Sequence, residues 1–289
     1  MPDQSIHRVG LLGWPVEHSL SPILHQAAFD AYDMPWCYDL LPINPAGFQS
    51  EIASFLSTDL RGFNVTAPYK EAIIPFLKRC DDSSQQLLAV NTVSKTKSGD
   101  WIGHNTDVIG LKMTLQSCCD FIPPLDKVTV LGNGGAARAV LHVLLNFPVR
   151  KIQILARDPG KTIKMLDRGL RKLAGGLAIN SGLLSENQVE IALQTSQLII
   201  NATPVGMQHV SKKSYIKKDA KIPENLVFLD LIYHPLETQM MKQIIAGGGR
   251  ACNGLEMLIH QAAAAFSIWT GKTAPIEIMK AALQKRNMQ

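Results

Sequence analysis

Short apolar runs alternate with helical patterns along the first third of the chain. The runs are long enough for buried strands, and each ends at a glycine, a proline or a polar cluster. The predicted strands here are residues 8–13, 36–41, 60–67 and 87–93. The predicted helices are residues 22–29, with Ser21 as N-cap before Pro22, and residues 45–56. Such alternation of strand and helix is typical of an α/β layer with mostly parallel strands.

The same alternation continues through the rest of the chain. Further buried strands are predicted at residues 127–131, 151–156, 197–201 and 225–233, and a long helix at residues 253–266. The pattern therefore predicts the α/β class, with two domains: a parallel-rich N-terminal α/β domain and a doubly wound, Rossmann-like domain. A chain of 289 residues is long enough for two such cores.

Composition excludes several other classes of protein. The chain is 46% hydrophobic and 18% charged, and its net charge of +5 comes from scattered lysines and arginines without a basic stripe, so no nucleic-acid partner is expected. Five cysteines show no metal-ligand spacing, which predicts no metal and fits a reducing cytoplasm. No apolar run approaches the roughly 20 residues of a membrane helix, and no membrane partner or targeting segment is expected.

The stretch from Gly62 to Lys70 is the strongest candidate for chemistry. A strand that ends before Pro68 and turns into a helical pattern can hold one lysine in a fixed direction. Thr66 and Asn64 supply a hydroxyl and an amide nearby. Taken alone, Lys70 is more simply a surface lysine after a turn, and only the other polar clusters favour a functional role.

Two of those clusters lie beside predicted helix starts. Ser19 and Ser21 are either caps or, together with free helix amides, a small anion site that suits a carboxylate. Asp107 is either an N-cap or a functional carboxylate. Asn91 is the amide in an apolar run, so it must satisfy neighbouring backbone or face a ligand.

A glycine-rich turn follows the predicted strand at 127–131. Gly132-Asn133-Gly134-Gly135-Ala136-Ala137 has the GxGxxA spacing that lets a pyrophosphate approach a helix N-terminus. The next strand ends in Ala156-Arg157-Asp158, with Lys161 three residues on. Arg157 and Lys161 favour the 2′-phosphate of NADP, whereas Asp158 favours NAD. The prediction is NADP, with NAD as the alternative.

Eight motifs, in order along nearly the whole chain, resemble the shikimate dehydrogenase family. They are His18-Ser-Leu-Ser-Pro22, Asn64-Val-Thr-Ala-Pro-Tyr-Lys70, Ala89-Val-Asn-Thr92, Asn105-Thr-Asp107, Gly132-Asn-Gly-Gly-Ala136, Asn201-Ala-Thr-Pro-Val-Gly-Met207, Asp230-Leu-Ile-Tyr233 and Gln261-Ala-Ala263. The resemblance implies a substrate-binding domain of residues 1–106, completed by C-terminal helices in 254–289, and a Rossmann NADP-binding domain of residues 107–253. It also implies an active site in the cleft between the domains.

The resemblance further implies a role for each matching residue. Lys70 and Asp107 are the implied catalytic pair. The implied substrate contacts are Ser19, Ser21, Thr66, Asn91, Asp107, Tyr233 and Gln261. The implied cofactor contacts are Asp82, Gly132, Asn133, Gly134, Gly135, Ala136, Ala156, Arg157, Asp158, Lys161, Thr203, Leu231, Gly254 and Met257. Members that use NADP typically have Asn-Arg-Thr where this chain has Ala156-Arg157-Asp158, so the departure concerns cofactor preference.

The function implied is reversible, NADPH-dependent reduction of 3-dehydroshikimate to shikimate, in aromatic amino acid biosynthesis in the cytoplasm. An NAD-dependent quinate/shikimate dehydrogenase would share nearly every residue named. A non-catalytic sensor of shikimate-type ligands should have lost Lys70 or Asp107, and a reductase for another substrate leaves the serine pair, Asn91 and Gln261 unexplained. The partners expected are small molecules, with the protein itself a monomer or a homodimer.

Overall fold

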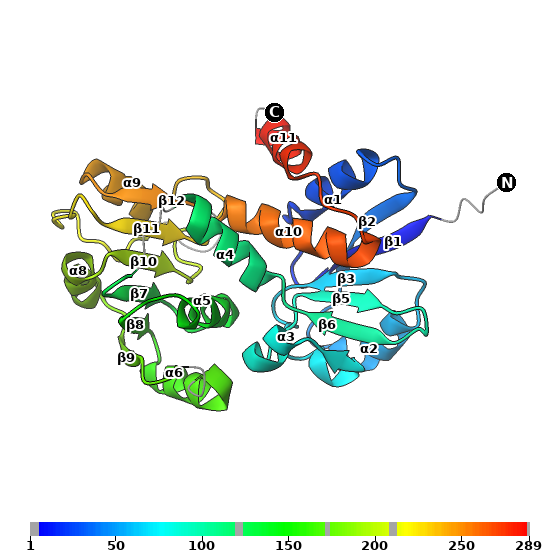
Figure 1. Cartoon of the computed structure of the whole chain (residues 1–289), viewed down its shortest axis with the longest axis horizontal. Helices are drawn as coiled ribbons and strands as arrows, with labels where there is room; N and C mark the ends of the chain where they lie inside the picture. Colours follow the sequence, from blue (N-terminus) through cyan, green and yellow to red (C-terminus); the bar gives the residue numbers. More distant parts are fainter. Residues whose placement is uncertain (1–5, 119–123, 171–173, 208–212, 288–289) are drawn as a thin grey trace. The chain divides into compact units, whose positions relative to one another are not determined.

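The computed structural model describes residues 6–118, 124–170, 174–207 and 213–287 (Figure 1). The chain divides into two compact units, residues 1–110 with 259–289, and residues 111–258. The boundaries between them fall inside the helices α4 (Asp107–Cys118) and α10 (Leu255–Thr270). The predicted domain boundaries, 106/107 and 253/254, stand a few residues earlier in each case.

The first unit is built on a six-stranded mixed sheet with the strand order β2-β1-β3-β5-β6-β4. Its strands are β1 (His7–Gly13), β2 (Trp36–Pro42), β3 (Gly62–Val65), β4 (Arg79–Cys80), β5 (Thr92–Lys95) and β6 (Trp101–His104). β1 runs parallel to β2 and β3, whereas β5 is antiparallel to both its neighbours, β3 and β6. The end of β3, the start of β5 and the end of β6 therefore meet at one edge of the sheet.

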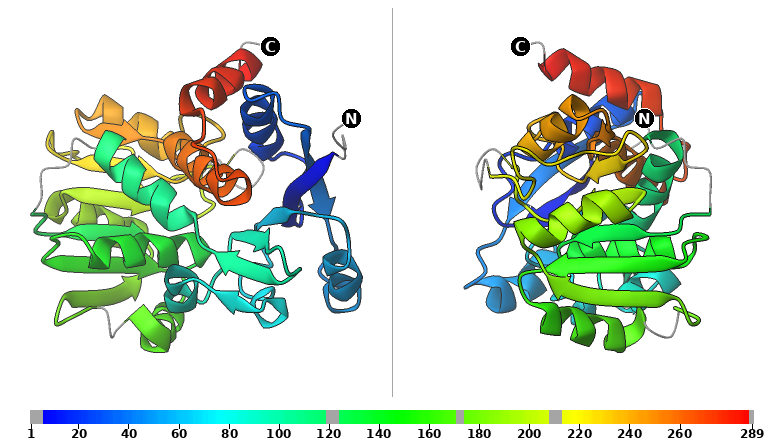
Figure 2. Two further views of the ribbon diagram at one scale, coloured as in Figure 1. Left: turned by 45° about the vertical axis from the view of Figure 1, so that its right-hand side comes forward. Right: turned by 90° about the vertical axis from the view of Figure 1, so that its left-hand side faces the viewer.

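Helices cover this sheet and bury its apolar side chains. They are α1 (Ser21–Asp30), α2 (Phe48–Leu56), the 3-10 helix η1 (Ile74–Phe76), α3 (Asp82–Leu87) and α11 (Ile276–Asn287), with parts of α4 and α10. Phe63 and Val93 of the sheet and Ile52 of α2 are fully buried and belong to one hydrophobic cluster. α11, at the far end of the sequence, packs against α1 (Figure 2). The N- and C-terminal segments thus belong to one core.

The second unit is a six-stranded sheet, parallel throughout, with the strand order β12-β11-β10-β7-β8-β9. Its strands are β7 (Val128–Leu131), β8 (Lys151–Ala156), β9 (Ala178–Leu183), β10 (Leu198–Asn201), β11 (Val227–Asp230) and β12 (Arg250–Cys252). Its helices are α5 (Gly135–Leu145), α6 (Pro159–Met165), the π-helix η2 (Leu166–Leu170), α8 (Glu186–Thr195) and α9 (Gln239–Ala246). After β7 the chain forms β8 and β9 on one side of that strand, and then β10, β11 and β12 on its other side. The strand order therefore reverses between β7 and β10.

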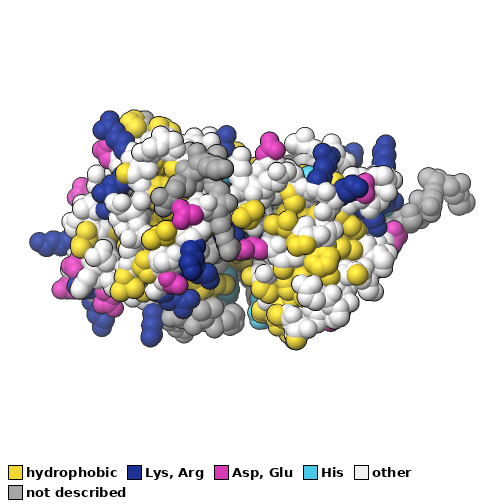
Figure 3. Space-filling view, turned by 90° about the horizontal axis from the view of Figure 1, so that it is seen from below, with side chains coloured by type: hydrophobic (Ala, Val, Ile, Leu, Met, Phe, Trp, Pro, Cys, Tyr) yellow, Lys and Arg dark blue, Asp and Glu magenta, His cyan; other side chains and the backbone are white. Residues whose placement is uncertain are grey.

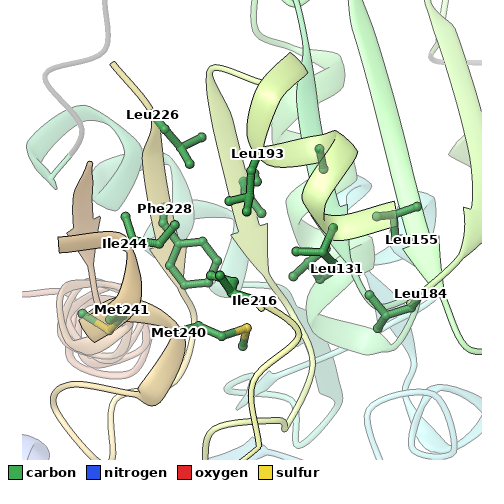
Figure 4. Close-up of a cluster of buried hydrophobic side chains, with 13 residues drawn as sticks. Leu131, Leu155, Leu184, Leu193, Ile216, Leu226, Phe228, Met240, Met241 and Ile244 are labelled. Carbon is green, nitrogen blue, oxygen red and sulfur yellow. The ribbon is translucent and has the colours of Figure 1, made fainter. Parts of the chain in front are cut away.

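The central strands of this sheet are buried on both faces, which explains why they read as continuous apolar runs in the sequence. On one face, Leu131 and Phe228 from the strands pack against Leu193 of α8 and Met240 of α9 (Figure 4). The doubly wound architecture predicted for this half of the chain is confirmed.

Three predictions of local structure are wrong. Residues 87–93 are not one strand, because α3 continues to Leu87, Leu88 adopts a left-handed conformation with φ 50°, and β5 begins only at Thr92. Ser21 is the first residue of α1 and not its N-cap, and the N-cap, Leu20, makes no side-chain capping bond. The strand predicted at 225–233 ends at Asp230, where that carboxylate accepts the Ile232 N–H at 3.1 Å and turns the chain.

On the face of the molecule seen in Figure 3, lysine and arginine side chains are scattered among acidic and apolar ones, as expected from their spacing in the sequence. None of the helices that the structure describes has both the length and the apolar character that crossing a lipid bilayer requires.

Candidate active site

The side chains of Lys70 and Asp107 form an ion pair in the first unit. Nζ of Lys70 lies 2.6 Å from Oδ2 of Asp107, and the two side chains are 26% and 11% exposed. Lys70 follows the turn after β3, and Asp107 is the first residue of α4, after β6. The pair forms because β3 and β6 end at the same edge of the sheet.

Packing on both sides of Lys70 holds its backbone in place. The neighbouring Tyr69 is buried, and its ring stacks on Phe48 with 4.2 Å between the centroids. The Lys70 carbonyl accepts the Val90 N–H at 2.8 Å. The fixed backbone sets where the side chain begins, and the ion pair with Asp107 then positions the ammonium, as a proton donor requires.

Asn91, just before β5, connects the ion pair to the rest of the sheet edge. Its Nδ2 donates to Oδ1 of Asp107 at 2.8 Å and to Oγ1 of Thr106 at 2.9 Å, and its Oδ1 accepts the Thr106 N–H at 2.7 Å. A carboxylate can only accept and a backbone N–H can only donate, so the two contacts agree on the orientation of the amide. The structure thus brings together Lys70, Asn91 and Asp107 and adds Thr106, to which the sequence assigned no role.

The two predicted serines lie next to each other at the start of α1. The Ser19 hydroxyl accepts the Ser21 N–H and donates to the Ser21 hydroxyl, both at 3.2 Å. Ser21 is buried and Ser19 half-buried. Two hydroxyls at a helix N-terminus suit an anionic group.

Three further residues with predicted substrate contacts are half-buried. Thr66 directly follows β3, and its N–H donates to the Leu12 carbonyl at 2.9 Å. Gln261 lies on α10 within the first unit. Tyr233 belongs to the second unit, in the loop after β11, where burial raises the pKa of its phenol.

The glycine turn of the second unit connects β7 to α5. Gly132 has φ 102°, and a Cβ there would lie 2.9 Å from the Ala202 carbonyl oxygen, so only glycine fits. A Cβ on Gly134 or Gly135 would have no atom within 4 Å. Those two glycines are therefore not required by packing, and they leave open space in front of the α5 N-terminus. The turn fits a dinucleotide pyrophosphate, which needs that space and the free amides.

A pocket of about 530 Å³ lies between the glycine turn and α6. It is lined by Asn133, Arg138, Asp158, Gly160, Lys161, Lys164 and Met165. Asn133 connects the two segments, because its Nδ2 donates to the Asp158 carbonyl at 2.9 Å and to Oγ1 of Thr162 at 3.0 Å. Arg138 and Lys164 were missed in the sequence. Lys164 could have been found, because it stands three residues after Lys161 and shares its face of the helix.

Asp158 has a structural task in this pocket. Its Oδ1 accepts the Lys161 N–H at 3.1 Å and caps the N-terminus of α6. Ala156 is the buried last residue of β8, and Arg157 is exposed directly after it. Because the Asp158 carboxylate caps α6, its presence here is weaker evidence for a contact with the ribose 2′-hydroxyl of NAD than the sequence suggested.

The remaining residues predicted to contact the cofactor lie at several places. In the second unit Thr203 is next to Gly132, and a Cβ on Gly254 would overlap the Leu231 carbonyl oxygen, so that position also requires glycine. Met257 is half-buried on α10. Asp82 belongs to the first unit, as the first residue of α3, whose N-cap is Asp81.

Comparison with known proteins identifies the family. Residues 11–93 match the shikimate dehydrogenase substrate binding domain, and residues 254–284 match the shikimate 5′-dehydrogenase C-terminal domain. Shikimate dehydrogenase (NADP(+)) of Microcystis aeruginosa is 36% identical over 281 residues, which cover 96% of this chain and 96% of that protein. The chain belongs to the shikimate dehydrogenase family.

Two solved structures also match closely. A shikimate dehydrogenase in complex with NADP+ has a TM-score of 0.87 at 34% identity, covering 99% of this chain and 97% of that one. Quinate dehydrogenase from Corynebacterium glutamicum, in complex with NAD, has a TM-score of 0.86 at 27% identity, covering 96% and 99%. The resemblance predicted from eight motifs is confirmed, as is the fold class.

Proposed function

We propose that this protein is a shikimate dehydrogenase that catalyses the reversible, NADPH-dependent reduction of 3-dehydroshikimate to shikimate, a step in aromatic amino acid biosynthesis. The observation that carries the proposal is the Lys70–Asp107 ion pair, held by Asn91 in a chain of this family. An ammonium and a carboxylate in contact, partly shielded from water, are suited to move a proton to or from a secondary alcohol.

Lys70 is the proposed acid–base residue. NADPH, when bound, supplies the hydride that forms the new C–H bond at the carbonyl carbon. As negative charge grows on the carbonyl oxygen, the Lys70 ammonium donates a proton to it, forming the O–H bond of the alcohol. Asp107 holds the ammonium in position and balances its charge. In the oxidative direction the neutral amine of Lys70 accepts the hydroxyl proton.

Most of the proposed substrate contacts are polar groups of the first unit. Ser19 and Ser21 would bind the ring carboxylate, because their hydroxyls lie together at the α1 N-terminus. Thr66, Asn91 and Asp107 would bind ring hydroxyls, with Gln261 of α10 and Tyr233 as further contacts by family resemblance.

The cofactor contacts are proposed on the second unit. The turn from Gly132 to Ala136 would bind the pyrophosphate at the α5 N-terminus, with Asn133 fixing the turn. Lys161, Lys164 and Arg138 give the adjoining pocket a positive lining that suits the 2′-phosphate of NADP. Thr203, Leu231, Gly254 and Met257 are proposed nearer the nicotinamide, by family resemblance.

A second candidate is an NAD-dependent quinate/shikimate dehydrogenase. Two observations favour it: Asp158 lines the pocket, and the quinate dehydrogenase in complex with NAD matches the chain at a TM-score of 0.86. Against it stand the three cations of the same pocket. The non-catalytic sensor is disfavoured because Lys70 and Asp107 are both present and in contact.

One assay separates these candidates. Purified protein is offered shikimate and then quinate, each with NADP and then NAD, and formation of the reduced nicotinamide is followed by absorbance. We expect shikimate with NADP to give the highest kcat/KM. Preference for quinate with NAD would support the second candidate, and no turnover with any pair would refute the proposed function. Light scattering on the same sample distinguishes a monomer from a homodimer. We propose that the protein acts in the cytoplasm.

A further inference from the structure

Behind the Lys70–Asp107 pair, a chain of buried polar side chains runs through the sheet of the first unit. Asn64 of β3 donates from Nδ2 to Oγ1 of Thr92 at 3.0 Å and to the Asn91 carbonyl at 3.2 Å. Tyr38 of β2 donates its hydroxyl proton to Oδ1 of Asn64 at 2.7 Å. Thr92 is fully buried, and Tyr38, Asn64 and Asn91 are at most 7% exposed. Bulk water therefore does not supply the hydrogen bonds of these side chains.

The direction of each hydrogen bond follows from what the groups can donate. The Asn91 carbonyl is only an acceptor, so the Asn64 atom facing it must be Nδ2, and the Asn64 atom facing Tyr38 must be Oδ1. Burial raises the pKa of the Tyr38 phenol, with a hydrogen bond to Ser21 opposing the rise, so the phenol keeps its proton to donate.

The same accounting leaves two acceptors for the Thr92 hydroxyl proton, Oδ1 of Asn91 and Oγ1 of Thr106. Its Oγ1 lies 3.2 Å from Oδ1 of Asn91 and 3.1 Å from Oγ1 of Thr106, and Oγ1 of Thr106 lies 3.2 Å from the same Oδ1. Nδ2 groups of Asn64 and Asn91 already donate to these two hydroxyls. The two hydroxyl protons cannot point at each other, so at least one of them is donated to Oδ1 of Asn91. The chain is therefore directional from Tyr38 to Asp107.

We propose that Thr92 is a positioning residue for the reaction: it transmits the orientation set by Tyr38 and Asn64 to the Asn91 amide, so that Asn91 keeps Oδ1 of Asp107 and leaves Oδ2 to Lys70. The proposal rests on the proposed function. Without the Thr92 hydroxyl, Oδ1 of Asn91 keeps only the donors of Thr106, so the amide is held less firmly toward Asp107. The carboxylate then has both oxygens available to hold the ammonium, which delays proton transfer.

The pair of variants Thr92→Val and Thr92→Ser tests this role. Valine keeps the shape of the side chain and removes the hydroxyl, whereas serine keeps the hydroxyl and removes the methyl group. We expect Thr92→Val to lower kcat for shikimate oxidation about five- to tenfold, the scale of one buried hydrogen bond, with the KM for NADP unchanged. The pH at which oxidation reaches half its maximum should move upward. Thr92→Ser should stay within about twofold of the wild type, on the same scale.

A merely structural role predicts that both variants lose stability, valine through the unpaired Nδ2 of Asn64 and serine through a small cavity, while the pH profile of oxidation stays that of the wild type. Thr129→Val is the matched control. Oγ1 of Thr129 is also fully buried and lies 2.8 Å from another hydroxyl, Oγ of Ser196, in the second unit. It should lower the melting temperature and leave the pH profile unchanged. Thr92→Val with the kcat and pH profile of the wild type, or Thr92→Ser with the larger loss, would overturn the proposal.

Tyr38→Phe gives a second and independent test if Thr92→Val does not fold. It removes the donor at the far end of the chain, and we expect kcat to fall in the same direction by about twofold or more, a fraction of the effect of one buried hydrogen bond. An unchanged kcat in Tyr38→Phe would overturn the proposal. A wild-type protein that turns over neither shikimate nor quinate would instead refute the proposed function, so the two failures are distinguishable.

Discussion

Lys70 and Asp107 are 37 residues apart in the sequence, and their side chains are in contact at 2.6 Å. The contact depends on the order of three strands, since β5 lies between β3 and β6 and is antiparallel to both. If β5 were parallel, Asn91 would lie at the opposite edge of the sheet and could not bond Asp107. The catalytic pair and its orienting amide are thus a product of the mixed sheet.

Removal of the Lys70 amine tests its role in the chemistry. We expect Lys70→Ala to lower kcat by about 10²–10⁴-fold, the usual contribution of a positioned acid or base, with the KM for shikimate nearly unchanged. Steady-state kinetics with shikimate and NADP measure both values. Lys97→Ala, which removes an exposed lysine of the same unit, is the control and should behave as the wild type. Retained turnover in Lys70→Ala would exclude this lysine as the acid–base group.

The two directions of the reaction should respond differently to pH. Reduction uses the charged form of Lys70 as proton donor, whereas oxidation needs the neutral amine as proton acceptor. We therefore expect shikimate oxidation to accelerate from neutral toward alkaline pH, while reduction does not. Initial rates in both directions across this range measure the effect. A flat oxidative profile would mean that another group accepts the proton.

The serine pair should act on binding and not on chemistry. Ser21→Ala removes one hydroxyl from the proposed carboxylate site, and the loss of one hydrogen bond, about 1 kcal/mol, corresponds to roughly fivefold weaker shikimate binding. Tryptophan fluorescence titration with shikimate gives the affinity, and kcat should change less. Ser57→Ala, an exposed serine after α2, is the control. Equal affinity in Ser21→Ala and the wild type would place the carboxylate elsewhere.

The sequence predicts the strands of this protein better than its helix ends and turns. Buried parallel strands such as β7 and β8 are continuous apolar runs, and these were predicted within one or two residues. The apolar run at 87–93 was misread, because a helix end, a left-handed residue and a strand start follow one another there and periodicity cannot separate them. Ser21 has the residue type and the following proline of an N-cap, but its hydroxyl instead bonds Ser19.

The sequence also left part of the candidate site unpredicted. Motif resemblance indicated Lys70, Asn91 and Asp107, but the sequence alone could not show that they touch, because this depends on strand order. Thr92 received no role because a threonine at the start of a strand is ordinary, and only its bonds to Asn64, Asn91 and Thr106 distinguish it. Local spacing is visible in a sequence, whereas convergence of distant segments is not.

Charge changes in the pocket beside the glycine turn should alter cofactor preference. Lys164→Ala removes an exposed cation, and we expect the KM for NADP to rise about two- to fivefold, the scale of an exposed ion pair, with the KM for NAD unchanged.

Asp158→Asn tests the same pocket in the opposite direction. It keeps a capping side chain for α6 and removes a negative charge, so the KM for NADP should fall relative to that for NAD. Lys151→Ala, at the other end of β8, is the control. Equal changes with NAD and NADP would mean that the pocket does not bind the 2′-phosphate.

A buried carboxylate in the second unit should make stability depend on pH. Burial raises the pKa of Asp230 to about 6, although Thr238, the Ile232 N–H and Asn201 donate to it and oppose the rise. The folded state therefore binds this proton more tightly than the unfolded state, and the stabilisation is complete below the ordinary pKa of 3.8 and lost as pH rises through about 6. Asp230→Asn resembles the protonated form at every pH. Between acidic and neutral pH, its free energy of unfolding should therefore rise relative to that of the wild type by on the order of 2–3 kcal/mol. Urea unfolding at a series of pH values measures the difference, with Glu224→Gln, an exposed site of the same unit, as the control. A constant difference between Asp230→Asn and the wild type across this range would show that Asp230 does not titrate there.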